Sequence, residues 1–413
     1  MIRTTAKWPF SPVSDVAKIH LGGTPKRAIP EYWGGDIKWA SAADIASCNS
    51  CYIRRTTENI TPLGVQRSAA KVLGKNTIVI TARGTVGAVC LLPEPMSFNQ
   101  SCYGLVCNAE TDPNYFYYAL KARIRQIKAQ TYGAVFDTIT IQSFDNITVP
   151  TPQIDTQRKI AAILSAYDNL IENNIRRIRI LEEMAQMIYR EWFINFRFPG
   201  HETIRMVDSK LGKIPEGWDI LNLFDIAEVA YGFPFKSKFF SSKKSGLPVV
   251  RIRDINQGYS STYTPEEVAP KYIVNNGDIL VGMDGNFGMC KWTGGAALLN
   301  QRVVRFRPKT AFGRYHLFLA LEAPIHFFDS TVVGTTVAHL SDEDLRSIEL
   351  SLPNSKCAKE RYDVFEPLLD LEINLCVQDT LLRKTRDLLL PRLISGELDV
   401  SDLDIAINDS GGS

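Results

Sequence analysis

The sequence carries one pattern twice, and this repeat constrains the fold more than any other feature. One set of residues recurs 210 positions later: Trp8, Asp15, Ala17, Gly22, Asp44 and Ile45 return as Trp218, Asp225, Ala227, Gly232, Asp254 and Ile255. A second set recurs 201 positions later: Gly84, Gly87, Asn99, Gln100, Gly133, Ile147, Pro152 and Leu181 return as Gly285, Gly288, Asn300, Gln301, Gly334, Ile348, Pro353 and Leu382. A repeat of this length indicates two copies of one structural unit rather than one large fold. Because the copies are similar but not identical, they suggest a protein that recognises two different things at a fixed separation.

Each copy ends in a long segment whose apolar residues are spaced alternately four and three apart. In the first copy the helix-pairing candidates are Leu164, Tyr167, Ile171, Asn174, Ile178 and Leu181, and in the second they are Leu368, Leu371, Leu375, Gln378 and Leu382. This spacing is typical of a coiled-coil seam. A helix of about 38 residues would be roughly 57 Å long, longer than a domain of this size needs. We therefore expect the two helices to pair, with Asn174 and Gln378 as buried amides that fix the register. The alternative is that each helix folds back on its own domain.

The composition is that of an ordinary globular protein. Hydrophobic residues make up 45% of the 413 residues and charged residues 22%, and this length suits several domains. The sequence has no apolar run of 18 residues and no apolar signal core at its start, so we expect a cytoplasmic protein without membrane contact. The net charge of +2 argues mildly against a dedicated nucleic-acid binder. Local basic clusters, such as Lys121 to Lys128, weaken that argument.

We predict an α+β fold class: two similar domains with mainly antiparallel sheets, separated by two long helices that pack as an antiparallel coiled coil. Short β-type runs punctuated by glycine and proline support the sheets, and helices are expected at Tyr115 to Gln130 and Arg314 to Phe328. The predicted organisation is a domain at 1–153, a helix at 154–197, a linker at 198–217, a second domain at 218–354, a second helix at 355–396 and a tail at 397–413.

The sequence offers no catalytic set and no cofactor site. It contains neither a phosphate-binding loop nor a dinucleotide fingerprint, and it lacks the metalloprotease and nucleophile-elbow motifs. The five histidines do not recur between the copies, whereas a duplicated enzyme should repeat its catalytic residues. Cys48 and Cys51 form one C-x-x-C, but no second ligand pair of matching spacing exists, so we expect no metal. The prediction is a protein that is not an enzyme.

The recurring polar positions resemble turns that follow β-type runs. Arg83, Gly84 and Thr85 match Asp284, Gly285 and Asn286, while Asn99, Gln100 and Ser101 match Asn300, Gln301 and Arg302. Asparagine and glutamine can make bidentate bonds to adenine, and arginine to guanine. The candidate DNA-binding residues are Ser41, Arg83, Thr85, Asn99, Gln100, Ser101, Arg251, Arg253, Asp284, Asn286, Asn300, Gln301 and Arg302.

Two kinds of candidate are distinguished by whether they recur. Residues that read different bases should differ between the copies. The better candidates for base recognition are therefore the differing pairs: Arg83 against Asp284, Thr85 against Asn286, Ser101 against Arg302, and Ser41 and Ala43 against Arg251 and Arg253. The recurring Asn-Gln pairs are better interpreted as braces of the turn or as backbone contacts. A third matched loop, 133–139 against 334–340, is expected to pack each domain onto its helix.

With the long helices in place, the chain resembles the specificity subunit of a Type I restriction–modification system. The resemblance covers almost the whole length and is strongest in the strings LGKIPEGW (Leu211 to Trp218) and LLLPRLISGELDV (Leu388 to Val400). Val149 to Gln153, followed by Gln157 to Ile160, is the usual approach to the central helix. The first copy departs from the pattern, because Lys7-Trp8-Pro9 stands where the second copy has IPEGW.

The resemblance implies that two target-recognition domains each bind one half of a split, asymmetric double-stranded DNA site. It implies that the paired helices act as a spacer and dock for modification (methyltransferase) subunits, two in number, with restriction subunits as further partners. Methyl transfer to adenine and DNA cleavage would then belong to those partners. Two other hypotheses remain open: a coiled-coil scaffold that binds no DNA, and a duplicated enzyme.

Overall fold

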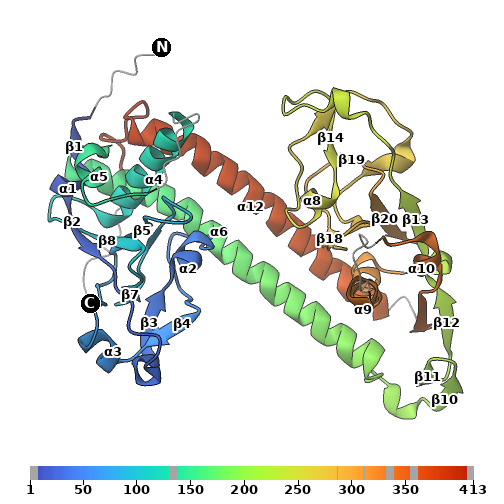
Figure 1. Cartoon of the computed structure of the whole chain (residues 1–413). Coiled ribbons are helices and arrows are strands. Elements are labelled where there is room, and N and C mark those ends of the chain that lie inside the picture. Colours follow the sequence, from blue (N-terminus) through green and yellow to red (C-terminus); the bar gives the residue numbers. More distant parts are fainter. Residues whose placement is uncertain are drawn as a thin grey trace. The chain divides into compact units, whose positions relative to one another are not determined.

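The computed structural model describes residues 8–130, 138–285, 287–309, 312–331, 339–353 and 361–406. Two compact units emerge: unit 1 comprises Met1–Glu172 and Leu381–Ser413, and unit 2 comprises Asn173–Thr380. Each of the two long helices therefore has one end in unit 1 and the other in unit 2. The boundaries predicted from the sequence had instead set each helix apart, at 154–197 and 355–396. Figure 1 labels most of the elements along the chain.

Unit 1 contains two small sheets and a strand pair. Its elements, in chain order, are β1 (Phe10–Pro12), α1 (Val13–Val16), β2 (Ala17–Leu21), β3 (Trp33–Ala40), α2 (Ala42–Ala46), β4 (Glu58–Ile60), α3 (Pro62–Gln66), β5 (Ile78–Thr81), β6 (Val89–Leu91), β7 (Ser97–Phe98), β8 (Cys102–Cys107), α4 (Pro113–Gln130), α5 (Ser143–Asn146) and β9 (Thr148–Pro150). The sheet β2-β8-β5-β6 is antiparallel, and β4-β3-β7 contains one parallel pair, β3 with β7. The strand β1 pairs with β9, which brings the start of the unit to the approach of the long helix.

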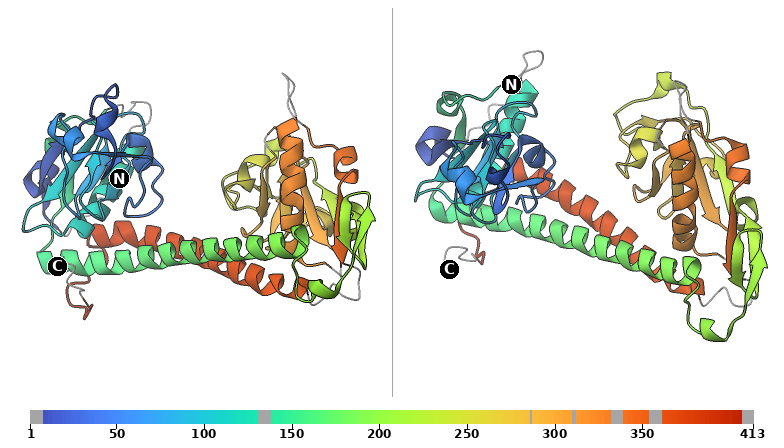
Figure 2. Two further views of the ribbon diagram at one scale, coloured as in Figure 1. Left: turned by 90° about the horizontal axis from the view of Figure 1, so that it is seen from below. Right: turned by 60° about the horizontal axis from the view of Figure 1, so that its bottom comes forward.

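The α+β part of unit 2 repeats this topology with one added strand, Ile273–Val274, and a two-stranded hairpin precedes this part in the chain. Its elements are β12 (Trp218–Asn222), α7 (Leu223–Ile226), β13 (Ala227–Tyr231), β14 (Leu247–Val250), α8 (Ile252–Ile255), β15 (Tyr263–Thr264), β16 (Ile273–Val274), β17 (Ile279–Gly282), β18 (Met289–Lys291), β19 (Ala297–Leu299), β20 (Val303–Pro308), α9 (Arg314–Thr331), α10 (Asp342–Arg346) and β21 (Glu349–Pro353). The sheets β13-β20-β17-β18 and β15-β14-β19-β16 and the pair β12-β21 correspond to those of unit 1. In Figure 2, α9 is the orange helix, and it lies beside β20 of the sheet β13-β20-β17-β18. The predicted duplicated α+β fold with mainly antiparallel sheets is thus confirmed.

The segment 198–217, predicted to be a linker, is partly structured. Met206–Ser209 (β10) and Gly212–Pro215 (β11) form an antiparallel hairpin. Ile214 is buried in the same core as Trp218 and Phe198. The linker prediction was wrong for this stretch because its polar residues and glycines belong to a hairpin turn, while Ile214 anchors it to the domain.

The two long helices, α6 (Ile154–Tyr189) and α12 (Phe365–Ile394), pair in opposite directions. In unit 1, Ile160 and Leu164 near the start of α6 share a core with Leu393 near the end of α12. In unit 2, Ala185 near the end of α6 shares a core with Phe365 at the start of α12. The helices are therefore antiparallel, as expected.

The predicted seam on α6 coincides with its buried side. Leu164, Ile171, Asn174 and Leu181 are buried, and Tyr167 and Ile178 are half-buried. The amide of Asn174 is only 5% exposed, so the expected polar position within this seam is present.

The predicted seam on α12 is out of phase by about one residue. Leu375 is buried and Leu368 and Leu382 are half-buried, but Leu371 is 40% exposed and Gln378 is exposed. The covered positions instead follow the series Phe365, Leu369, Glu372, Cys376, Asp379, Arg383, Arg386, Leu390 and Leu393. The middle of this seam is charged, so a search for an apolar stripe misplaces it. Gln378 was wrongly assigned to the pairing face for this reason.

Within the described ranges, no helix is both long and apolar enough to cross a lipid bilayer.

Candidate nucleic-acid interface

Backbone hydrogen bonds bring four segments of unit 1 to one edge of the domain. The N–H of Ala82, after β5, donates to the carbonyl of Ser101 at 2.7 Å, and the N–H of Ile139 donates to the carbonyl of Ala82 at 3.0 Å. The N–H of Asn99 donates to the carbonyl of Ala40 at 3.0 Å. The β5–β6 turn, the β7–β8 turn, the end of β3 and the segment from residue 138 are therefore neighbours.

Unit 2 reproduces these bonds at the equivalent positions. The N–H of Met283 donates to the carbonyl of Arg302 at 3.0 Å, that of Leu340 to Met283 at 2.8 Å, and that of Asn300 to Val250 at 3.3 Å. We call this set of turns the turn edge. In unit 1 its members are residues 41, 83–87, 99–101 and 138; in unit 2 they are residues 251, 284, 285, 287, 288, 300–302 and 339. The two units thus present different side chains on one backbone frame.

Two recurring glycines allow the turn edge to form. A Cβ atom on Gly22 would lie 2.1 Å from the carbonyl oxygen of Asn99, and one on Gly232 would lie 1.9 Å from that of Asn300. No side chain fits at these distances, so the β7–β8 and β19–β20 turns can approach only glycine. This contact accounts for the recurrence of the glycine.

The recurring asparagines brace their own turns. The Asn99 Oδ1 accepts from the N–H of Ser101 at 3.0 Å, and the Asn300 Oδ1 accepts from that of Arg302 at 3.4 Å. The geometry therefore agrees with the interpretation of these residues as braces. The neighbouring Gln100 and Gln301 are exposed, and neither side chain bonds to a described residue.

The exposed candidates of unit 1 surround the β5–β6 turn. Arg83 and Thr85 are exposed and Ser101 is half-buried. The Arg83 guanidinium makes no hydrogen bond or ion pair with any residue that the structure describes. Ser41 differs, because its hydroxyl accepts from the N–H of Asp44 at 3.1 Å and caps α2. Ser41 is on the turn edge, but its side chain is committed to this cap.

In unit 2 the candidates divide in the same way. Arg251 donates to Thr262 and lies over the ring of Phe240, 5.7 Å from its centroid, whereas Arg253 is 67% exposed. Asp284 joins two neighbours on the turn edge: its Oδ1 is 2.6 Å from Nδ1 of His339, and its Oδ2 is 3.3 Å from Nε of Arg302. Asn286 lies outside the described residues, as does most of the matched pair of loops at 133–139 and 334–340.

His339 was missed by sequence reasoning. It occupies the position that Thr138 holds in unit 1, inside the third matched loop. Arg83 and Arg302 were selected because they differ from their counterparts at matched positions of the two copies. Thr138 and His339 meet the same criterion. It was passed over because the histidines were tested only for recurrence.

A polar cluster joins the α+β part of unit 1 to the helices. Asp168 of α6 accepts from the Tyr118 hydroxyl at 2.6 Å and the Cys51 thiol at 2.8 Å, and it forms a buried ion pair with Arg386 of α12. Burial, aided by the Asp168 charge, raises the pKa of the Cys51 thiol to about 12. Lys121, one of the basic residues considered for phosphate contact, is half-buried instead and donates to the Tyr117 hydroxyl at 2.8 Å.

Unit 2 uses a different polar cluster at its helices. Lys291 of β18 lies 2.8 Å from Glu372 of α12 and 3.5 Å from Glu182 of α6, with the Tyr315 hydroxyl at 3.4 Å. Lys291 and Glu372 are both nearly buried. Each domain therefore contacts its helices through a charge pair of its own, Asp168 with Arg386 in unit 1 and Lys291 with Glu372 in unit 2. Across the described ranges, no group of three or more His, Cys, Asp and Glu residues is placed to hold a metal ion.

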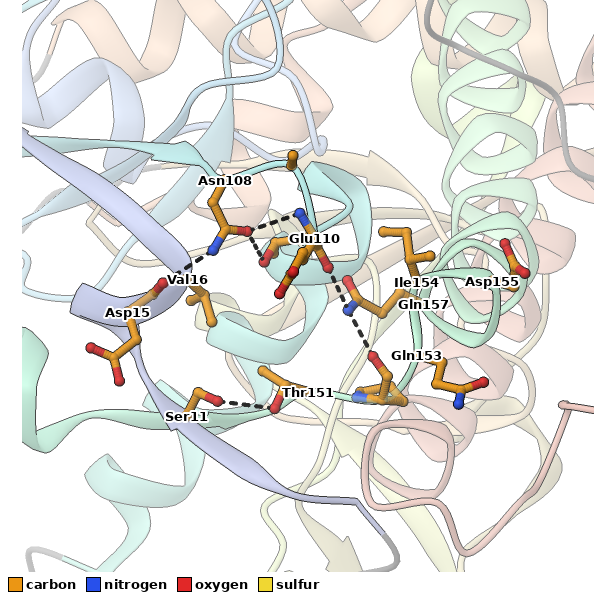
Figure 3. A pocket seen from close by; sticks show the side chains of 13 residues that line it. Ser11, Asp15, Val16, Asn108, Glu110, Thr151, Gln153, Ile154, Asp155 and Gln157 are labelled. Carbon is orange, nitrogen blue, oxygen red and sulfur yellow. Dashed lines mark hydrogen bonds between the residues drawn. The ribbon is translucent and has the colours of Figure 1, made fainter.

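A cleft of about 660 Å³ opens beside the start of α6 in unit 1 (Figure 3). The buried amide of Gln157 lines this cleft and donates to the carbonyls of Pro152 at 2.8 Å and Glu110 at 3.1 Å. Three carboxylates line it: Asp15, Glu110 and Asp155. Because these would repel phosphate, the cleft does not suit DNA and the turn edge remains the better candidate.

The comparisons with known proteins agree with this architecture of two like domains on paired helices. The family model described as "Type I restriction modification DNA specificity domain" matches residues 6–183 and 215–378. The chain therefore belongs to this family of Type I specificity subunits.

Individual relatives match along most or part of the chain. The MjaIX specificity subunit of a Type I restriction enzyme from Methanocaldococcus jannaschii is 28% identical over 96% of this chain and 94% of its own. The EcoBI specificity subunit of Escherichia coli is 30% identical over 51% of this chain and 46% of its own. Among solved structures, the S subunit of a Type I system from M. genitalium superimposes with a TM-score of 0.61 at 17% identity, covering 95% of this chain and 98% of that one, which shows a shared fold.

Proposed function

We propose that this chain is a non-catalytic specificity subunit that recognises a bipartite, asymmetric DNA target. One observation carries the proposal: the two turn edges share a backbone frame but carry different side chains. Arg83 of unit 1 corresponds to Asp284 of unit 2, and Ser101 corresponds to Arg302. A common frame that positions different hydrogen-bonding groups suits the reading of two different base sequences.

The paired helices are proposed as both spacer and docking site. With 36 residues, α6 is roughly 54 Å long at about 1.5 Å per residue. One turn of B-DNA is about 34 Å, so half-sites about one to one and a half turns apart would suit such a spacer. The relatives named above are specificity subunits of restriction enzymes, which supports methyltransferase and restriction subunits as partners. We propose two methyltransferase subunits, one for each half-site.

Exposed apolar side chains on α6 support docking of a protein partner there. Ile180, Met184 and Met187 follow one another four and three residues apart and are 42%, 42% and 65% exposed. A contiguous exposed apolar stripe is a common feature of protein interfaces. The S-adenosylmethionine-dependent methylation of adenine would belong to that partner. The low net charge of +2 fits a complex in which partner subunits supply further phosphate contacts.

Methylation by the complex tests the proposal. The chain, purified with its methyltransferase partner, should direct methylation to a two-part sequence. Exchange of residues 8–150 for the corresponding domain of a relative should change one half of that sequence only. An unchanged methylation pattern would refute the assignment.

The same stripe on α6 would also suit a scaffold that binds no DNA, and salt dependence separates the two hypotheses. DNA affinity should fall steeply between 50 and 200 mM salt, by roughly 10³ for six phosphate contacts. A scaffold would show no DNA affinity to lose.

A further inference from the structure

Arg302 of the second turn edge has the geometry of a preoriented base-reading residue. Its Nε lies 3.3 Å from Oδ2 of Asp284, and its side chain is 64% exposed. The two terminal nitrogens, Nη1 and Nη2, bond to no residue that the structure describes. A guanidinium held through Nε keeps its outer N–H groups available for a planar, bidentate acceptor.

His339 is held by the same carboxylate. Its Nδ1 lies 2.6 Å from Oδ1 of Asp284. Because a carboxylate only accepts, Nδ1 must carry the hydrogen. The opposite ring nitrogen, Nε2, bonds to no described residue, and the side chain is 59% exposed. Asp284 thus has both oxygens occupied and orients two exposed side chains.

The backbone fixes this arrangement from three sides. Asp284 and His339 form an antiparallel β-bridge, and Met283 is bonded to both Arg302 and Leu340. The equivalent positions of unit 1 are Arg83, Ser101 and Thr138, whose side chains make no contact of this kind among the described residues. The cluster is therefore specific to the second domain, as a determinant of one half-site should be.

We propose that Asp284 is a positioning residue that holds Arg302 for a bidentate contact with the O6 and N7 atoms of one guanine. The guanine lies in the half-site read by the second domain, and His339 contacts the neighbouring base edge. This inference rests on the proposed function. Its chemistry is selective because, in the major groove, only guanine presents two acceptors at the spacing of a guanidinium fork.

The test is methylation mapping of the genome in a host that carries the complete system. In the Arg302→Ala variant we expect one position of one half-site to lose its requirement for guanine, while the other half-site stays unchanged. Discrimination at that position should fall by roughly 5- to 150-fold, the range of one bidentate contact. In Asp284→Asn, selectivity for guanine should fall less than in Arg302→Ala. Because this substitution removes a negative charge, the affinity for non-specific DNA should stay the same or rise.

Arg197→Ala is the matched control. Arg197 also belongs to unit 2, is 67% exposed and pairs with Glu191 at 3.5 Å, but it lies outside the turn edge. This variant should leave the methylated sequence unchanged.

The outcomes separate the inference from the proposed function. If the wild-type complex yields no two-part sequence, the proposed function itself fails. The inference alone is overturned if the wild-type complex yields a two-part sequence whose half-site for the second domain contains no guanine. It is also overturned if Arg302→Ala keeps the same methylated sequence and only lowers methylation at all sites. A mere brace of the turn would give that last result, together with a lowered melting temperature.

Discussion

Asp168 of α6 and Arg386 of α12, 218 residues apart in the chain, form an ion pair in which both side chains are about one-tenth exposed. The same carboxylate accepts from Tyr118 and Cys51 of the α+β part of unit 1. One side chain therefore joins both long helices to the domain. Substitution of Arg386 by a neutral residue would leave the buried Asp168 carboxylate without its positively charged partner.

Arg386→Met should destabilise unit 1 by about 3 kcal/mol, because a broken buried pair typically costs that much or more. Arg392→Met is the control. Arg392 lies on the same helix and pairs with Glu397, but both side chains are about half exposed, so the loss should be below about 1 kcal/mol. Hydrogen exchange of the full chain measures both. If both substitutions lowered the unfolding free energy equally, the buried pair would contribute no more to stability than the exposed one.

Acid should weaken unit 1 through the same carboxylate. Burial opposes ionisation of Asp168, but the hydrogen bonds from Cys51 and Tyr118 and the Arg386 charge outweigh it, so the pKa lies below the ordinary 3.8. Because the pKa is lowered in the folded state, the ionised carboxylate stabilises the fold fully above the pKa of the unfolded state. This stabilisation is lost as the pH falls through the pKa of the folded state. Unfolding free energy should thus decline below about pH 4, and the decline should be smaller in Asp168→Asn.

Glu372 of unit 2 should show the opposite dependence on pH. Burial raises its pKa above the ordinary 4.5, although Lys291 acts against the shift. The folded state binds this proton more tightly than the unfolded state does. The contribution of Glu372 to stability is therefore greatest below its pKa in the unfolded state, and it falls as the pH rises through its pKa in the folded state. Glu372→Gln should remove this loss between pH 4.5 and the raised pKa. A pH profile unchanged by that substitution would contradict the assignment.

Lys291 and Glu372 should be strongly coupled in unit 2. Their charged atoms are 2.8 Å apart, and both side chains are less than one-tenth exposed. Lys291→Met alone leaves a buried carboxylate and should cost about 3 kcal/mol. With Glu372→Gln added, part of that loss should be recovered, giving a coupling energy of about 1–3 kcal/mol in a double-mutant cycle by urea denaturation. Strictly additive single effects would exclude a direct pair.

These charge pairs also show where the sequence was a sufficient guide and where it was not. The duplication, the α+β class and the α6 seam could be predicted because they rest on recurrence and on apolar spacing. The α12 seam could not, because Glu372 and Arg386 occupy covered positions and count as surface residues in any apolar pattern. Their burial depends on Lys291 and Asp168, which are distant in sequence.

The candidate site follows the same logic. The turn edge was predictable because matched positions such as Arg83 and Asp284 stand out in the repeat. Ser41 and Arg251 were selected in the same way, but each side chain is engaged within its own domain, by Asp44 and by Thr262. Such local bonds depend on turn geometry, which spacing alone does not reveal.

Gly232 offers the most direct test that the turn edge determines specificity. A Cβ atom there would lie 1.9 Å from the Asn300 carbonyl oxygen, so Gly232→Ala must displace the turn that carries Arg302. We expect a loss of about 2 kcal/mol or more in unfolding free energy, as for other overpacked sites. Gly74→Ala is the control, since nothing lies within 4 Å of its added Cβ and a change within about 0.5 kcal/mol is expected.

The functional consequence of Gly232→Ala should be confined to one half-site. Gly22→Ala, which would meet the Asn99 carbonyl at 2.1 Å, should affect the other. Methylation mapping of the two variants should therefore give complementary losses, each with one half of the sequence requirement relaxed and the other retained. Both variants must be assayed at a temperature at which circular dichroism shows them folded. If each relaxed both halves equally, the turns would not read the two half-sites independently, because a displacement confined to one domain could not then account for the change.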